Sequence, residues 1–332
     1  MPVRTRCGVS SLPDTRGSAG AAGDRVPPLL VIAGPTATGK TRLAIDVALQ
    51  LRIEGIPAEV VSADSRQVYR GLDIGTAKPT PAERRDVPHH GLDLVEPDAP
   101  FSLADFADHV AAVLPTIERN AGIAILAGGT GLYIRAIARG LDTAALPSDP
   151  PTRRRIEAEL EQGGLEAAAG RLRSLAPILA GRVDLRNPRR VARALEIVVL
   201  QGDHPLPEPR GYPGAVAWLG VDVPRDIHRA WIVDRARAQF ERGLIDEARD
   251  LRNRYDPGLP AFSAIGYAES WAVLDGSLDL AAAMELDVAR NIAFARRQRT
   301  WFRREPEIAW HDPSAADPLP RAIELATRLR DG

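Results

Sequence analysis

A short glycine-rich segment near the start of the chain carries residue types that bind phosphate. The apolar run Leu29–Ala33 leads into Gly34, and four residues separate that glycine from Gly39, Lys40 and Thr41. This is the pattern G-x-x-x-x-G-K-[ST] in the strand–loop–helix context that a P-loop requires. Its backbone N–H groups form an anion nest, the lysine adds a mobile charge, and the threonine hydroxyl suits Mg²⁺. The segment therefore predicts a di- or triphosphate site without identifying the compound.

Two further polar groups follow apolar segments. Asp64 comes directly after 58–63, and Thr130 follows 122–127 through a Gly-Gly pair. Because the carboxyl ends of parallel strands meet at one edge of a sheet, both residues should lie beside the P-loop. An aspartate in this position is often only a turn or N-cap residue. Facing bound phosphates, it can instead hold a metal shell or take a proton from a nucleophile.

Arginines gather in two segments far apart in the sequence. In 188–201, apolar residues share one face, and only Glu196 is near enough to neutralise the opposite face. That opposite face carries Arg186, Arg189, Arg190 and Arg193. A solvated surface and a phosphate-binding stripe are equally good readings of this pattern. The segment 290–304 is also basic, and we expect its aromatic residues Phe294, Trp301 and Phe302 to be core.

The elements that must position these residues alternate between strand and helix. This alternation predicts an α/β fold with a doubly wound parallel sheet of the P-loop NTPase-like type. We expect strands at 29–33, 58–63, 122–127 and 215–221. Ser102 and Asp105 form a capping box before one helix, and 80–100 should be irregular. The helices expected in this core are 41–53, 103–117, 132–139, 226–242, 244–254, 267–275, 280–304 and 319–330.

The domain organisation follows from changes in pattern along the chain. Residues 1–27 are rich in Gly, Ser, Pro, Arg and Ala and predict a disordered N-terminal tail. The P-loop core should comprise 28–140 and 206–315, the latter with the C-terminal helices. Residues 141–205 predict an inserted helical subdomain with helices at 153–160, 165–175 and 188–201. Residues 316–332 should form a C-terminal helix or tail.

Composition narrows the possibilities further. The net charge is −1, so any nucleic-acid surface must be local. A single cysteine excludes a disulfide framework and suits a reducing cytoplasm. No apolar run approaches a membrane span, and we expect a monomer without membrane association. Only two of the 43 basic residues are lysines, Lys40 and Lys78. His89-His90 has no third ligand nearby in the sequence, which argues against a metal site there.

The residues alone leave different classes of function open. A P-loop with a carboxylate at the next strand end also describes a small-molecule kinase. The spread of the arginines over two distant segments fits a large polyanion better than a single γ-phosphate. A non-catalytic nucleic-acid binder would leave the P-loop and Asp64 without a purpose.

A set of motifs over 29–310 decides between these readings. They are Gly34–Thr41, Ser62–Tyr69, Asp73–Pro79, Gly128–Tyr133, Asn187–Glu196, Ser263–Tyr267 and Arg297–Arg303. Together and in this order they resemble the bacterial tRNA dimethylallyltransferase family, also called tRNA isopentenyltransferases. The P-loop alone is shared with many enzymes, whereas the whole set is highly specific.

The resemblance implies a reaction and residue roles. A dimethylallyl group would pass from dimethylallyl diphosphate to the N6 amine of the adenosine 3′ of the anticodon. The tRNAs would be those reading codons that begin with U, and diphosphate would be released. By resemblance Asp64 is the general base, Thr41 acts with Mg²⁺, and Arg235 contacts the diphosphate. The implied diphosphate-binding residues are Gly34, Thr36, Ala37, Thr38, Gly39, Lys40, Thr41 and Arg235.

The resemblance also implies which residues lie against the anticodon arm of tRNA. They are Asp64, Ser65, Arg66, Gln67, Thr130, Arg153, Arg189, Arg190, Arg193, Gly266 and Tyr267. The chain departs from the family at Ala268, where a basic residue is common, and at Asn291-Ile292, where Thr-Arg is common. A sister group that prenylates free adenine nucleotides shares the P-loop chemistry. The inserted arginine helix and the basic C-terminal segment favour tRNA.

Overall fold

The centre of the molecule is a six-stranded, all-parallel sheet. A computed structural model describes residues 25–143 and 145–331. The strand order is β3-β2-β4-β1-β5-β6. The four inner strands are the expected ones, and their bounds are β1 Leu29–Ala33, β2 Ala58–Ala63, β4 Ile123–Gly128 and β5 Val216–Val221. Val31 of β1 pairs with Leu126 of β4 on one side and with Trp218 of β5 on the other.

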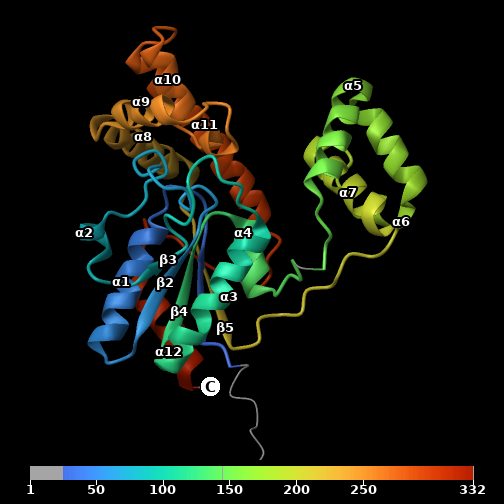
Figure 1. The fold of residues 1–332 in the computed structure, drawn as a ribbon. Coiled ribbons are helices and arrows are strands. Elements are labelled where there is room, and N and C mark those ends of the chain that lie inside the picture. Colours follow the sequence, from blue (N-terminus) through green and yellow to red (C-terminus); the bar gives the residue numbers. More distant parts are fainter. Residues whose placement is uncertain (1–24, 144, 332) are drawn as a thin grey trace, which may run out of the picture.

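Helices cover both faces of this sheet, as the alternating pattern predicts (Figure 1). Alternate residues of β1 enter two separate apolar clusters, with Val31 in one and Ile32 in the other. The second cluster is completed by α1 Lys40–Ile53 and α12 Leu319–Asp331. On the opposite face lie α3 Leu103–Arg119 and α4 Gly131–Ala138. The C-terminal segment is therefore a helix that belongs to the core.

The sequence patterns did not predict three short elements of the core. The range 80–100, expected to be irregular, contains helix α2 Pro81–Arg84 and strand β3 His89–His90. Strand β6, Ala309–His311, forms the other edge of the sheet. A two- or three-residue edge strand and a single helical turn are too short to generate a period.

The remaining core helices lie beyond the carboxyl ends of the strands (Figure 1). They are α8 Arg225–Glu241, α9 Leu244–Arg254, α10 Tyr267–Leu274 and α11 Leu280–Phe302, with a 3₁₀ turn η1 at Pro260–Ser263. α8 packs on α11, and α9 packs on α10. These helices cover the edge of the sheet where the sequence predicts the P-loop, Asp64 and Thr130.

The inserted helices form a separate body, joined to the core by two extended segments (Figure 1). They are α5 Pro150–Leu175, α6 Pro177–Ala180 and α7 Pro188–Gln201, and they share their own apolar cluster. α5 corresponds to the two helices expected at 153–160 and 165–175, because its backbone breaks at Gly164 with φ 77°. The short α6 is absent from the sequence prediction.

The two extended segments meet at the edge of the core. The N–H of Arg210 donates to Gly140 O at 3.0 Å, and that of Gly211 donates to Arg139 O at 2.9 Å. Gly140 has φ +60°, and a Cβ there would meet Gly211 O at 2.2 Å. Both ends of the insertion are therefore fastened at one point.

The structure describes only the last residues of the expected N-terminal tail. Residues 1–24 of the expected tail lie outside the described residues. Its last residues are part of the core, since Tyr212 donates its hydroxyl to Pro27 O at 2.7 Å. Among the helices that the structure describes, none is long and apolar enough to cross a membrane.

Candidate active site

The conformation of the P-loop requires glycine at two positions. Gly34 has φ +156°, and a Cβ on it would meet Val221 O of the neighbouring strand at 2.1 Å. Gly39 has φ +81° and directly precedes α1. The main-chain N–H groups of residues 37–41 donate no hydrogen bond to any residue in the described part of the chain. Open donors at the start of a long helix form an anion-binding site.

A cavity of about 570 Å³ lies in front of these donors. Its lining includes the P-loop residues Thr36–Thr41, the expected base Asp64 and Arg235 from α8. Gly128 and Gly129 contribute the end of β4, and Gln298 comes from α11. Thr130 lies beside the cavity, where its hydroxyl accepts the N–H of Ser65 at 3.0 Å. The expected convergence of the P-loop, Asp64 and the β4 end is thus present in the structure.

Two cations in the cavity are desolvated and form no ion pair among the described residues, although the more distant Asp64 raises the pKa of both. Lys40 is buried, its ammonium donates to Pro35 O, and burial lowers its pKa to about 7. The nearby Arg235 lowers this pKa further. The Arg235 Nε is buried without a hydrogen-bond partner among the described residues, and burial lowers its pKa too. An anion bound between them would stabilise both charged forms.

Asp64 is held by one of its oxygens. Its Oδ1 accepts the N–H of Arg66 at 2.9 Å, which is the turn role that an aspartate commonly plays here. The other oxygen has no hydrogen bond within the described residues, and the side chain lines the cavity. The turn role and a chemical role are therefore compatible, because the turn fixes the carboxylate with one oxygen still available.

Gln67 ties this loop to its neighbour. Ser62 donates its hydroxyl to Gln67 Oε1 at 2.9 Å, and Gln67 Nε2 donates to Thr76 O at 3.1 Å. Gln67 is buried and lines the cavity. It joins the strand end that carries Asp64 to the segment Asp73–Pro79.

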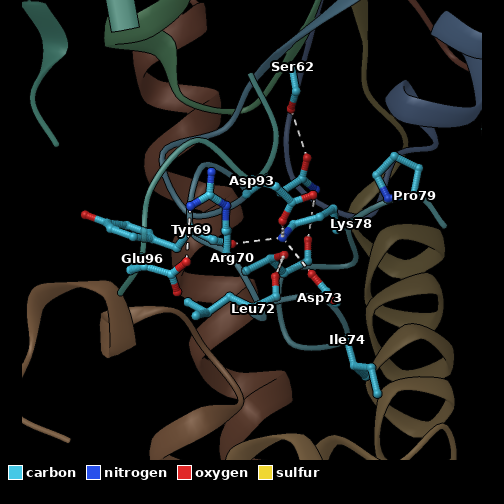
Figure 2. A network of polar contacts seen from close by, with 12 residues as sticks. Ser62, Tyr69, Arg70, Leu72, Asp73, Ile74, Lys78, Pro79, Asp93 and Glu96 are labelled. Atoms are coloured by element: carbon cyan, nitrogen blue, oxygen red, sulfur yellow. Dashed lines mark hydrogen bonds and ion pairs between the residues drawn. The ribbon is translucent and has the colours of Figure 1, made fainter. Parts of the chain in front are cut away.

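The second lysine of the chain organises that segment (Figure 2). Lys78 is buried and donates to Tyr69 O at 2.9 Å, to Asp73 at 2.6 Å and to Asp93 at 2.5 Å. Both carboxylates are partly exposed. Lys78 thereby joins two points of the loop that follows β2, at Tyr69 and Asp73, to Asp93 just after β3. Its rarity in an arginine-rich chain and its place in the motif Asp73–Pro79 single it out in the sequence, but neither indicates these partners.

Glu247 of α9 anchors the same loop from the other side. Its carboxylate accepts the N–H groups of Ile74 at 2.7 Å and of Gly75 at 3.1 Å, together with the Tyr267 hydroxyl at 2.8 Å. A Cβ on Gly75 would meet the Tyr267 ring at 2.6 Å. Nothing in the local sequence around Glu247 indicates this contact, which joins residues 172 positions apart.

Comparison with known proteins places the chain in a family. The sequence model described as IPP transferase matches residues 67–305, and a second model, described as isopentenyl transferase, matches 27–92. The chain belongs to the IPP transferase family. The tRNA dimethylallyltransferase of Anaeromyxobacter dehalogenans is 44% identical over 307 residues, covering 89% of this chain and 99% of that protein. The tRNA dimethylallyltransferase of Thermus thermophilus is 43% identical, covering 83% and 89%.

Solved structures agree with this membership. The full-length tRNA isopentenylpyrophosphate transferase of Bacillus halodurans has a TM-score of 0.66 and 35% identity, covering 92% of this chain and 96% of that one. A eukaryotic dimethylallyltransferase acting on tRNA has a TM-score of 0.69 at 23% identity, which is a likeness of fold alone.

Within this IPP transferase, the arginines expected to meet tRNA fall into two groups. Arg153 donates to the buried carboxylate of Glu196 at 2.8 Å, and Arg193 donates to it at 2.6 Å. Arg193 also donates to Pro147 O at 2.8 Å. By contrast, Arg189 and Arg190 are exposed at the start of α7. The single stripe expected from the helical wheel is therefore partly an internal ion-pair cluster.

The residues at the start of α10 that were predicted to contact tRNA are buried, whereas a residue just before them is exposed. The Tyr267 side chain is fully buried, so it presents no surface of its own to a ligand. Gly266 is buried at φ +109° and caps α10. Ser263, just before it, is exposed. Arg66 is half-buried and donates to Pro260 O at 2.8 Å, which links this segment to the Asp64 loop.

The basic segment of α11 has two faces. Phe302 is core as expected, whereas Phe294 is half-buried and lines the P-loop cavity beside Gln298. Trp301 is also half-buried. The opposite face borders a second cavity of about 570 Å³ whose lining includes Arg225, Arg229, Arg296, Arg299 and Arg303. A polyanion would find positive charge on this side.

The His89-His90 pair has structural partners. His90 contacts the Glu59 carboxylate through Nε2 at 2.6 Å, and His89 Nδ1 contacts Val87 O at 2.8 Å. Within residues 25–143 and 145–331 no cluster of three metal-binding side chains exists.

Proposed function

We propose that this protein transfers the dimethylallyl group of dimethylallyl diphosphate to the N6 amine of the adenosine 3′ of the anticodon. The tRNAs are those reading codons that begin with U, and diphosphate is the second product. One observation carries the proposal: an anion nest, two desolvated cations without an ion-pair partner among the described residues, and a carboxylate with one free oxygen share one cavity. We place the reaction in the cytoplasm, where its tRNA substrate is found.

The nest and the cations serve the leaving group. Breaking the bond between the allyl carbon and the diphosphate oxygen develops negative charge on that oxygen. The N–H groups of 37–41, Lys40 and Arg235 face the cavity where this charge would develop. Fixed donors in a desolvated site stabilise such charge more than water does. Phe294, Ile45 and Pro79 supply apolar surface in the same cavity.

Asp64 serves the acceptor. As the amine nitrogen bonds to the allyl carbon it must lose a proton, and the free oxygen of Asp64 is the carboxylate oxygen in the cavity lining suited to accept it. A positioned general base contributes about 10²–10⁴-fold to the rate. Extruding an unpaired loop base from its stack costs roughly a few kcal/mol. The exposed arginines Arg189 and Arg190 would help to offset that cost through the phosphates of the anticodon arm.

The residues present fit Mg²⁺ held largely by the substrate. The described part of the chain offers no acidic cluster that could form a protein cage. Mg²⁺ commonly keeps several waters and binds through one or two protein oxygens plus substrate phosphates. Thr41, which lines the cavity in the first turn of α1, would hold the ion beside the diphosphate through its hydroxyl. The ion would neutralise charge on the leaving group.

One experiment separates this function from its alternatives. The protein is incubated with dimethylallyl diphosphate labelled in the prenyl group, and with unmodified tRNA, AMP, or ATP plus either acceptor. Label in tRNA alone, at the N6 amine of the adenosine 3′ of the anticodon, is the expected outcome. Label in AMP alone would identify prenylation of free nucleotides, and ATP consumption without prenyl transfer would identify a kinase. The control tRNA carries guanosine at the target position and should remain unlabelled.

A further inference from the structure

Thr36 is the one P-loop residue whose three polar groups are all held from outside the loop. Its N–H donates to Gln298 Oε1 at 2.8 Å, and its carbonyl accepts from His228 Nε2 at 2.7 Å. Its hydroxyl accepts from Arg235 Nη1 at 2.6 Å. His228 and Arg235 belong to α8 and Gln298 belongs to α11, so the partners lie 192 to 262 positions away in the sequence.

The Gln298 side chain is fixed at both ends of its amide. While Oε1 accepts from Thr36, Nε2 donates to Gly129 O at 2.9 Å, at the end of β4. The side chain is buried, and a Cβ on Gly129 would meet its Nε2 at 2.2 Å. Gln298 therefore bridges two loops at the carboxyl edge of the sheet, and its amide cannot rotate without breaking both hydrogen bonds.

His228 is fixed by a second chain of contacts. Arg299 Nη2 donates to His228 Nδ1 at 2.7 Å, and Arg299 is paired with Asp222, directly after β5, at 2.7 Å. Because a guanidinium only donates, Nδ1 must carry the lone pair and Nε2 the proton. Burial and the Arg299 charge both lower the pKa of His228, which favours this neutral form. The imidazole thus donates to the Thr36 carbonyl in one defined tautomer.

We propose that Gln298 and His228 are positioning residues that set the P-loop for the diphosphate of the prenyl donor through Thr36. This inference rests on the proposed function. The two peptide groups flanking Thr36 fix the entry to Ala37, which has φ +59°. This left-handed region is unfavourable for a non-glycine residue. The bonds to Thr36 stabilise that conformation and with it the direction of the N–H groups that follow, before any ligand binds.

The alternative is that these contacts only hold α8 and α11 on the sheet. That role would lower stability on mutation without a specific effect on anion binding. Diphosphate binding to the free protein separates the two, because it needs neither tRNA nor catalysis. The probe is inorganic diphosphate with Mg²⁺, titrated by calorimetry against the full chain, and thermal unfolding is recorded for every variant.

Gln298→Met keeps the size of the side chain and removes both hydrogen bonds. We expect the diphosphate Kd to rise about tenfold, which corresponds to the loss of about 1.4 kcal/mol of preorganisation. The KM for tRNA should change less than twofold. The matched control is Gln239→Met, a buried glutamine of α8 that donates to Ile74 O at 2.6 Å and Gly75 O at 2.9 Å instead of the P-loop. It should lose similar thermal stability with less than a twofold change in diphosphate Kd.

His228 offers an independent test with a rescue. His228→Gln can still donate to the Thr36 carbonyl and accept from Arg299, so its diphosphate Kd should stay within about threefold of the parent protein. His228→Leu can do neither and should weaken binding about tenfold. Equal diphosphate affinity in the parent, Gln298→Met and His228→Leu proteins would overturn the positioning role and leave the proposed function intact. Failure of the parent protein to bind diphosphate would overturn the proposed function itself, and this inference with it.

Discussion

The P-loop cavity and the inserted helices both concentrate positive charge, but they treat it in opposite ways. In the cavity, Lys40 and Arg235 are desolvated and have no carboxylate partner among the described residues. In the insertion, Arg153 and Arg193 converge on the buried Glu196, while Arg190 extends into solvent. Leaving buried cations unpaired is costly. In the cavity, the bound anion that we propose would offset this cost. In the insertion, the paired arginines hold the helices together.

Of the four changes considered, removal of the proposed base, Asp64, should have the largest effect. Asp64→Asn keeps the side chain's size and its bond from the Arg66 N–H, but an amide cannot take the amine proton. We expect the single-turnover rate of prenyl transfer to fall by about 10²–10⁴-fold. Affinities for tRNA and diphosphate should stay within about threefold. A rate within tenfold of the parent protein would remove Asp64 from the role of base.

The pH dependence of diphosphate binding tests the desolvated lysine. The pKa of Lys40 is lowered to about 7, and a bound anion favours its protonated form, so binding takes up a proton above pH 7. Affinity should fall by up to about tenfold per pH unit as pH rises from 7 toward the pKa of the complex. Calorimetry in buffers of different ionisation enthalpy measures the proton uptake. Lys40→Arg, which stays charged, reports the titration of diphosphate itself, and an identical pH profile in both proteins would contradict the prediction.

Breaking the cluster in the insertion should have a smaller and local effect. Glu196→Gln removes the charge that Arg153 and Arg193 share, and both arginines are partly exposed and can turn to solvent. We expect a loss of about 1–2 kcal/mol in the stability of the insertion. Hydrogen exchange should quicken in α5 and α7 and stay unchanged in β1 and β4. Equal destabilisation of the sheet would mean that the insertion does not hold together independently.

The exposed arginine should show the smallest effect. Arg190→Ala is expected to weaken tRNA binding and reduce the log–log salt slope by about 0.7–0.9, the share of one phosphate contact. Arg173→Ala is the matched control on the same insertion, because Arg173 is exposed but pairs with Glu166. Filter binding over a salt series measures both slopes. An unchanged slope in Arg190→Ala would identify the start of α7 as ordinary solvated surface.

The sequence predicted the residues at the strand ends that line the site, but few of the residues that hold those loops in place. The P-loop, Asp64 and Thr130 could be placed because each follows an apolar strand, and strand ends in a parallel sheet share one edge. Strands β3 and β6 could not be seen, since edge strands of two or three residues carry no alternation. Tyr267 belonged to a recognised motif, but its complete burial depends on helices remote in the sequence.

Long-range partners account for the residues that sequence reasoning missed. Glu247, Gln298 and His228 act on main-chain atoms of loops 169 to 262 positions away. A main-chain partner leaves no complementary residue type in the sequence that could signal the contact. Glu196 was visible in the sequence as the acidic residue near the arginines of 188–201. Its burial and its contact with Arg153 were not visible, because a helical wheel does not show which side chain of another helix packs against a face.

The position of the insertion has a consequence for synthesis on the ribosome. β1 lies between β4 and β5 in the sheet, yet the whole insertion separates β4 from β5 in the chain. Until Val221 has emerged, the nascent β1 therefore has an open side, and an unpaired apolar strand invites pairing with other chains. The fastening of Gly211 to Arg139 brings the two ends of the insertion together and shortens the loop that β5 must close. Early folding of α5–α7 on their own apolar cluster would thus shield the growing chain from aggregation.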